Sequence, residues 1–316
     1  MSEILIGTGR GVFRMGSDGT IQQEQGPTTV AFMTRAHEGV VVMTQENALW
    51  RRTGGGGWQL LHERPVAEDI WSFAADPRLA GRLYLGVSPA LLYWSDDGGE
   101  TWKACESIRR IPGYESWTFP PPPHIPHVRS VAPDPQVVGA VYIGVEEGGI
   151  YRSADSGETW ESLNEGLYWD VHTVTPAPQG EPLYATTGRG FYRSDDGGRQ
   201  WHHLMNGLDR RYTVPLVASQ QRAGRLYTAA AAGPPPSWRQ GTNAALYRSD
   251  DGGERWVRLE EGLPQQFDAM VRQIAVDDAE TLYIAAGHEL FISRDEGDSW
   301  RKLAHELPTV QALAVL

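Results

Sequence analysis

The sequence is short of cysteine, of long apolar runs and of positive charge. Its one cysteine, Cys105, excludes an internal disulfide bond and fits a reducing compartment, so we expect a cytoplasmic protein. The stretch from Met1 to Gly7 has no basic segment, and no run of the chain reaches membrane-spanning length. We therefore expect no signal peptide and no membrane partner. The net charge of −12 argues against nucleic acid as the main partner, although it is compatible with a local cationic pocket.

Glycine, proline and tryptophan are plentiful, and they punctuate a repeat. The 36 Gly, 21 Pro and 12 Trp residues suit many short strands joined by turns. A pattern Ser-x-Asp-x-Gly-x-x-Trp occurs five times, and each copy follows a short run of aromatic and aliphatic residues. Such a repeat predicts the architecture before any single residue is interpreted. The aspartates of the five copies are Asp97, Asp155, Asp196, Asp251 and Asp295.

Each copy of the pattern is expected to form the tight turn of a β-hairpin. The glycine supplies the positive φ of the turn, and the Asp and Ser side chains bond the backbone N–H groups of the same turn. The tryptophan then leaves the turn and packs between neighbouring sheets. Because catalysis needs one site and this device is repeated, we interpret the five aspartates as structural, and not as catalytic or calcium-binding residues.

The pattern resembles the Asp-box, also called the bacterial neuraminidase repeat. This repeat occurs in sialidases, xyloglucanases, sortilin-type receptors and the photosystem II assembly factor. The resemblance implies a β-propeller whose boxes lie on the face opposite the binding site, and it leaves the activity open. The chain as a whole is similar to stand-alone bacterial Asp-box proteins, which are often labelled glycosyl hydrolases. Sialidases are six-bladed and use a tyrosine–glutamate pair that this sequence does not display, so none of their catalytic residues is carried over.

The number of repeats predicts the number of blades. Two degenerate copies, near Phe13 and Trp50, bring the hairpins to seven. At about 45 residues each, these units hold four strands, which is the blade size of a propeller. Residues 3–7 are predicted as a second strand, and residues 310–315 as an inner strand. We therefore predict an all-β fold, with residues 1–316 forming one seven-bladed β-propeller domain of four antiparallel strands per blade. In this prediction the C-terminal strand pairs into the N-terminal blade and closes the ring.

Two insertions, at about 111–126 and 233–241, interrupt the repeat. Propeller geometry predicts that both lie on the face opposite the Asp-boxes, and their prolines make them rigid. They carry the aromatic residues Trp117, Phe119 and Trp238. Long loops on one face of a rigid scaffold commonly bind ligands, although an insertion that only aids solubility, or is merely tolerated, is the alternative.

A second indication of a site comes from aligning the inner strands on the Asp-Pro turns that follow them. One position near the strand start holds Trp71, Arg129, His172, Val214, Arg272 and Gln311. Two residues earlier stand Asp69, His127, Asp170, Tyr212 and Met270. The turn between the second and third strands adds Arg10, Glu46, Glu146, Glu147, Arg189 and His288. Because these positions diverge in residue type, we expect them to surround a functional opening at the centre of the ring.

The residue types at this opening are compatible with several chemistries. The arginines would bind a carboxylate, sulfate or phosphate, and they are Arg10, Arg129, Arg189 and Arg272. Further ligand contacts are expected from Tyr212, Trp117, Trp238 and His288. His127 and His172 would act as acid or base, and Glu146 with Asp170 would form a carboxylate pair for glycoside hydrolysis. His127, His172 and Glu146 would equally bind a divalent metal, but no spacing is diagnostic of a cofactor.

Two functions therefore remain open. In the first, the propeller binds a small anionic or carbohydrate ligand, or a protein partner, on the face opposite the Asp-boxes, with no assigned catalysis. In the second, it is a glycosidase-like or other hydrolase or lyase acting on an anionic or carbohydrate small molecule in the central pocket. A binding protein should present a broad aromatic face, whereas an enzyme should hold two or three titratable groups within hydrogen-bond reach in a deep pocket.

Overall fold

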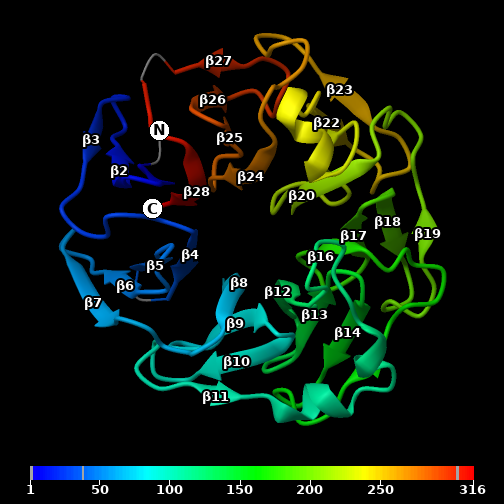
Figure 1. Cartoon of the computed structure of the whole chain (residues 1–316). Coiled ribbons are helices and arrows are strands. Elements are labelled where there is room, and N and C mark those ends of the chain that lie inside the picture. Colours follow the sequence, from blue (N-terminus) through cyan, green and yellow to red (C-terminus); the bar gives the residue numbers. More distant parts are fainter. Residues whose placement is uncertain (1–2, 38, 304–305) are drawn as a thin grey trace.

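The computed structural model of the protein describes residues 3–37, 39–303 and 306–316. Within these residues the strands form seven four-stranded antiparallel sheets, arranged as blades around a central axis (Figure 1). Three short 3₁₀ helices lie in the connections. This arrangement confirms the seven-bladed β-propeller predicted from the repeat.

The blades are numbered in chain order. Blade 1 contains β28 (Val310–Val315), β1 (Ile4–Thr8), β2 (Gly11–Met15) and β3 (Ile21–Gln23), and blade 2 contains β4 (Phe32–Ala36), β5 (Gly39–Met43), β6 (Leu49–Arg52) and β7 (Trp58–His62). Blade 3 contains β8 (Asp69–Ala75), β9 (Leu83–Ser88), β10 (Leu91–Ser95) and β11 (Lys103–Ala104), and blade 4 contains β12 (Val128–Pro133), β13 (Val141–Val145), β14 (Gly149–Ser153) and β15 (Glu161–Ser162). Blade 5 contains β16 (Val171–Pro176), β17 (Leu183–Thr187), β18 (Gly190–Ser194) and β19 (His202–His203). Blade 6 contains β20 (Tyr212–Ala218), β21 (Leu226–Ala231), β22 (Ala245–Ser249) and β23 (Val257–Leu259), and blade 7 contains β24 (Val271–Val276), β25 (Leu282–Ala286), β26 (Glu289–Ser293) and β27 (Arg301–Lys302).

The C-terminal strand closes the ring. β28 pairs antiparallel with β1, with Ile4 opposite Val315 and Ile6 opposite Leu313. The backbone N–H of Leu316 also donates to the carbonyl of Glu3 at 2.9 Å. Blade 1 is thus built from both ends of the described chain, and the predicted closure is confirmed.

The hydrophobic core lies between adjacent sheets. The second strands of the blades are apolar on both faces, and β13 and β17 are buried along their whole length. Small residues in these strands admit the inner strand of the next blade, because a Cβ on Gly86 would lie 2.5 Å from the carbonyl oxygen of Val128. The Ser72 hydroxyl donates to the same oxygen at 2.7 Å. The inner strands of blades 3 and 4 are therefore held in close contact.

The Asp-box turns have the local bonding that the sequence predicts. In blade 6 the Ser249 hydroxyl donates to Asp251 at 2.8 Å, and the backbone N–H of Arg255 donates to the same carboxylate at 3.0 Å. The Ser249 oxygen accepts the Gly253 N–H at 2.8 Å. Trp256, which is 2% exposed, packs edge-on against Phe191 of blade 5 with ring centroids 5.0 Å apart. The box therefore fixes a hairpin and also joins two blades.

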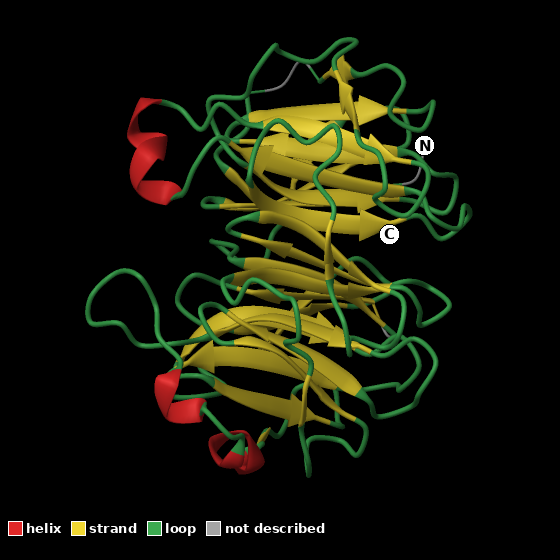
Figure 2. Cartoon of the chain, turned by 90° about the vertical axis from the view of Figure 1, so that its right-hand side faces the viewer, coloured by secondary structure: helices red, strands yellow, loops and turns green. Residues whose placement is uncertain are grey.

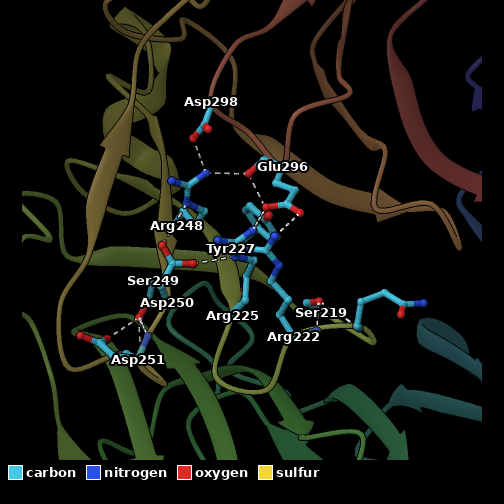
Figure 3. Close-up of polar contacts among 12 residues, drawn as sticks. Ser219, Arg222, Arg225, Tyr227, Arg248, Ser249, Asp250, Asp251, Glu296 and Asp298 are labelled. Atoms are coloured by element: carbon cyan, nitrogen blue, oxygen red, sulfur yellow. Dashed lines mark hydrogen bonds and ion pairs between the residues drawn. The ribbon is translucent and has the colours of Figure 1, made fainter.

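Arginines of one blade reach the Asp-box of the next (Figure 3). Arg248 of β22 donates to the Glu296 carbonyl at 2.8 Å and lies 2.6 Å from the carboxylate of Asp298. Arg225 pairs with Asp250 of its own blade at 2.6 Å and with the Glu296 carboxylate of blade 7. These contacts cross-link blades 6 and 7 on the Asp-box face.

The long connections lie on the opposite face. The 3₁₀ helices of the chain are η1 (Glu106–Arg110), η2 (Tyr114–Ser116) and η3 (Pro235–Gln240). Figure 2 shows these helices on the side away from the end of β28. Among the described residues, no helix has the length and hydropathy needed to span a membrane.

Candidate functional site

A β-bulge near the start of the inner strand recurs around the ring. In β12, Val128 pairs with Val145 and Ser130 pairs with Gly144, so Arg129 is the extra residue. In β16, His172 is the extra residue for the same reason. A bulge of this kind re-aims a side chain, and bulges are common beside functional sites. Within the described strands, six of the seven inner strands have this irregularity, namely β8, β12, β16, β20, β24 and β28.

The bulged residues surround one cavity. A cavity of about 660 Å³ at the centre of the ring is lined by residues of all seven inner strands. Its lining includes every member of the aligned position, which comprises Trp71, Arg129, His172, Val214, Arg272 and Gln311. The first aligned position therefore lines the channel, whereas no member of the other two predicted sets is among the described residues that line the cavity. The bulges explain why the channel side of these six strands carries the first position.

Glu146 lies at the centre of a charged cluster beside this cavity. It follows β13, is 4% exposed, and accepts a hydrogen bond from His127 Nε2 at 3.0 Å while also pairing with Arg129. Burial alone would raise the pKa of Glu146, but the hydrogen bond from His127 and the charge of Arg129 lower it to about 2. Glu146 is therefore ionised throughout the neutral range.

His127 is held in place by aromatic rings. It is fully buried, it stacks on Trp71 with centroids 3.6 Å apart, and the edge contact of Phe119 is at 4.7 Å. Burial lowers the pKa of His127, and the nearby charge of Arg129 acts in the same direction. A neutral imidazole that donates from Nε2 to Glu146 keeps a lone pair on Nδ1. The insertion at 111–126 thus reaches the site through Phe119.

Asp170 and His172 form the other half of the cluster. His172 is 2% exposed, and its Nδ1 donates to the Thr213 carbonyl at 2.5 Å. Its Nε2 lies 3.4 Å from Asp170 Oδ1. Both of these atoms are buried, and neither has a hydrogen-bond partner in the described part of the chain. Tyr212 packs on His172 at 4.4 Å, and burial raises the pKa of its phenol, so Tyr212 remains neutral.

Arg272 faces the cavity from the other side of the ring. Its side chain is exposed to the channel, yet the protein that encloses the channel and the positive charge of Arg129 lower its pKa. Among residues 3–37, 39–303 and 306–316, no salt-bridge or hydrogen-bond partner of its guanidinium is present. The site therefore presents two arginines that repel each other, and only Arg129 is paired, with Glu146.

The other predicted ligand contacts are not among the described residues that line the cavity. Arg10, Arg189 and His288 are exposed on turns between second and third strands, and Arg189 lies over the ring of Tyr168 at 4.4 Å. Trp117 is 7% exposed, and its indole donates to the Tyr151 hydroxyl at 3.0 Å. This position places Trp117 in the core beneath the insertion and does not fit a surface contact.

Trp238 is half-buried, and it meets Tyr212 edge-on at 5.8 Å. The sequence analysis did not single out Trp169, which is 46% exposed and directly precedes Asp170. The sequence signal that could have identified Trp169 is its place directly before Asp170, a member of the second aligned position. Glu147 follows Glu146 with a φ of 52°, and burial together with the charges of Asp170 and Glu146 raises its pKa.

One group of side chains has the spacing of metal ligands. Glu146, Asp170 and His172 each offer a donor atom, and these atoms all lie within 4.8 Å of one another. Two of these residues, Glu146 and His172, belong to the predicted metal set. The third predicted ligand, His127, stands instead behind Glu146, because its Nε2 donates to that carboxylate.

Fold and site together define a seven-bladed Asp-box propeller with a charged channel mouth. Residues 115–312, more than half of the chain, match the family described as the DUF6242 beta propeller domain, and the chain belongs to this family. Residues 93–104 match the BNR/Asp-box repeat, as expected from the first intact copy of the pattern.

Proteins similar to this chain include xyloglucanases and a protein named YCF48. A region of 111 residues, 34% of this chain, is 31% identical to the oligoxyloglucan-reducing end-specific xyloglucanase of Emericella nidulans and covers 12% of that enzyme. The GH74 xyloglucanase from Xanthomonas campestris superposes with a TM-score of 0.66 at 17% identity, over 95% of this chain and 46% of the enzyme. YCF48 from Cyanidioschyzon merolae has a TM-score of 0.60 at 15% identity, over 90% and 89% of the two chains. These structural likenesses show a shared fold, and the chain spans less than half of either xyloglucanase.

Proposed function

We propose that the channel mouth binds a carboxylate-bearing carbohydrate. The observation that carries this proposal is the pair of arginines in one cavity, of which Arg272 has no ion-pair partner among the described residues. A guanidinium that faces a second guanidinium gains most from an anion that binds both, and arginine binds a carboxylate through two parallel hydrogen bonds.

The aromatic residues around the cavity suit the rest of such a ligand. Trp71 and Phe73 line the cavity, and Trp169 is exposed beside Asp170. Flat aromatic faces pack against the apolar faces of sugar rings, and ligand sites commonly combine such surfaces with a few placed charges. The 31% identity to a xyloglucanase over part of the chain supports a carbohydrate as the scaffold of the ligand.

The test is calorimetric titration with oligogalacturonides and with neutral oligosaccharides of equal length. The wild type is expected to bind the acidic series and to bind the neutral series at least tenfold more weakly. Arg272→Gln should weaken acidic binding by about tenfold or more, because a hydrogen bond to a charged group contributes about 1.5–3 kcal/mol. Arg255→Gln is the matched control, since the side chain of Arg255 is exposed and lies in an Asp-box turn on the opposite face. Equal binding of the two series, or no binding of either, would overturn the proposal.

A glycoside hydrolase is the second candidate, and one observation favours it. The donor oxygens of Glu146 and Asp170 lie within 4.8 Å of each other, which is closer to the separation of about 5–5.5 Å in retaining glycosidases than to the wider spacing of inverting ones. In this reading Glu146, which His127 and Arg129 keep ionised, would be the nucleophile. Product release from the same oligosaccharides, lost in Glu146→Gln while binding persists, would support hydrolysis, and binding without any product would exclude it for these substrates.

A further inference from the structure

We propose that Glu146, Asp170 and His172 form a binding site for a divalent transition-metal ion at the channel mouth. The three donor atoms lie within 4.8 Å of one another and come from two adjacent blades. Glu146 follows β13 of blade 4, whereas Asp170 and His172 lie at the start of β16 in blade 5. This site does not depend on the proposed carbohydrate ligand.

The distance between two of the donors fits a shared ion better than a hydrogen bond. His172 Nε2 and Asp170 Oδ1 are 3.4 Å apart. Hydrogen bonds between nitrogen and oxygen span about 2.7–3.2 Å. Two ligands that each lie about 2.1 Å from a tetrahedral zinc ion are about 3.4 Å apart, which is the observed separation.

The hydrogen bonding of His172 points to the same conclusion. A backbone carbonyl accepts only, so Nδ1 of His172 must carry the proton that it donates to Thr213. The other ring nitrogen, Nε2, is turned toward Asp170 Oδ1. Both atoms are buried and, within the described residues, lack a hydrogen-bond partner. Buried polar atoms without a hydrogen-bond partner are costly, and a cation between these two atoms would satisfy both. A histidine that binds a metal through one nitrogen commonly donates its other N–H to a carbonyl in this way.

Glu146 is oriented as a third ligand would need to be. Its Oε2 is held by His127 and Arg129, which fixes the direction of the carboxylate without using its other oxygen. The two carboxylates carry two negative charges and Arg129 returns one positive charge, so the cluster keeps a net attraction for a cation. One imidazole with two carboxylates favours ions such as Zn²⁺ or Mn²⁺ over Ca²⁺ and Mg²⁺, which prefer oxygen ligands. Three protein ligands also leave a coordination position free, and His172 lines the cavity.

The test is metal binding by the full-length chain after treatment with EDTA and dialysis. Calorimetric titration with Zn²⁺ should show one site, and Mn²⁺ should give an electron paramagnetic resonance spectrum of bound ion at the same stoichiometry. Asp170→Asn and His172→Gln should each weaken Zn²⁺ binding at least 100-fold. Asp278→Asn and His202→Gln are the matched controls, because both residues are exposed and lie outside the site.

Thermal unfolding keeps the test decisive if a variant folds poorly. Zn²⁺ should raise the Tm of the wild type and of both controls, and it should leave the Tm of a folded Asp170→Asn variant unchanged. The proposal is overturned if the wild type binds neither ion, if the site variants bind as tightly as the controls, or if Ca²⁺ binds in preference to Zn²⁺.

Discussion

The five Asp-box turns and the channel mouth both place carboxylates at strand ends, on opposite faces of the ring. In the turns, each carboxylate is satisfied locally, as when Asp251 accepts from the Ser249 hydroxyl and the Arg255 N–H. At the channel mouth, Asp170 Oδ1 is buried without a hydrogen-bond partner among the described residues. The same side-chain type therefore has two uses. Repeated and self-satisfied groups stabilise the blades, whereas groups that occur once and remain unsatisfied are prepared for a ligand.

The electrostatic surroundings differ in the same sense. The carboxylates of the boxes are exposed, and hydrogen bonds from their own turn lower their pKa. Glu146 at the channel mouth is buried, and its charge is set by His127 and Arg129 across the blade. An Asp-box is thus complete within a few residues of sequence, but the channel site exists only after blades 4, 5 and 7 have assembled.

The largest expected effect concerns an Asp-box glycine. In an intact box, Gly253 has a φ of +94°, and a Cβ there would lie 2.1 Å from the Phe191 ring of blade 5. Gly253→Ala should lower the free energy of unfolding by roughly 1–3 kcal/mol from overpacking, with strain at positive φ adding to the loss. Urea unfolding followed by tryptophan fluorescence measures it.

The degenerate box of blade 2 supplies the control. A Cβ on Gly54 would meet no atom within 4 Å. Gly54→Ala should therefore change the free energy of unfolding by no more than about 0.5 kcal/mol. Equal losses in the two variants would refute the view that an intact box joins two blades by close contact.

The next expected effect separates the two uses of aspartate directly. Asp251→Ala removes the acceptor for Ser249 and Arg255, and it should cost about 1 kcal/mol of stability while Zn²⁺ binding persists. Asp170→Asn should have the reverse pattern, with lost Zn²⁺ binding and a smaller loss of stability. Calorimetric titration measures the Zn²⁺ affinity of each variant, and urea unfolding measures the free energy of unfolding of each. If Asp251→Ala lost binding at full stability, the assignment of the boxes to structure would be wrong.

The fold could be predicted from the sequence because each blade contains a recognisable hairpin motif within a short stretch of residues. The glycine and tryptophan of every box lie within a few residues of its aspartate, so seven hairpins and the closing strand β28 could be counted without a structure. The channel-lining position was also accessible, since the inner strands align on their Asp-Pro turns. The bulge that turns Arg129 and His172 toward the channel could not be predicted from the sequence, because a bulge depends on the register of the partner strand.

Contacts between blades were equally hidden. Trp117 was expected on the surface of an insertion, but the hydroxyl of Tyr151 accepts its indole N–H in the core. His127 was one of the residues expected to bind a metal. It instead stacks on Trp71 of the preceding blade and donates a hydrogen bond to Glu146, so that it orients the Glu146 carboxylate. Asp170 was expected in a carboxylate pair with Glu146 and not as a metal ligand, but its carboxylate lies with Glu146 and His172 in the group that has the spacing of metal ligands. Each of these outcomes rests on residues far apart in sequence, for which local spacing carries no information.

The smallest expected effect is the pH dependence of a single box. Hydrogen bonds from the Thr159 hydroxyl and backbone N–H lower the pKa of Asp155 from its ordinary value of 3.8 to about 2. Because the folded-state pKa lies below the unfolded value, the contribution of Asp155 to stability is fully present above the unfolded pKa. It is lost as the pH falls through that of the folded state, between about pH 4 and pH 2. Asp155→Asn keeps an acceptor oxygen but does not titrate, so its stability should fall less than that of the wild type between pH 5 and pH 2. Urea unfolding at both pH values measures this difference, which solvent screening of the exposed carboxylate keeps small. Identical pH profiles for the two proteins would show that this box draws no stability from the charge of its aspartate, and that its hydrogen bonds alone distinguish it from the channel carboxylates.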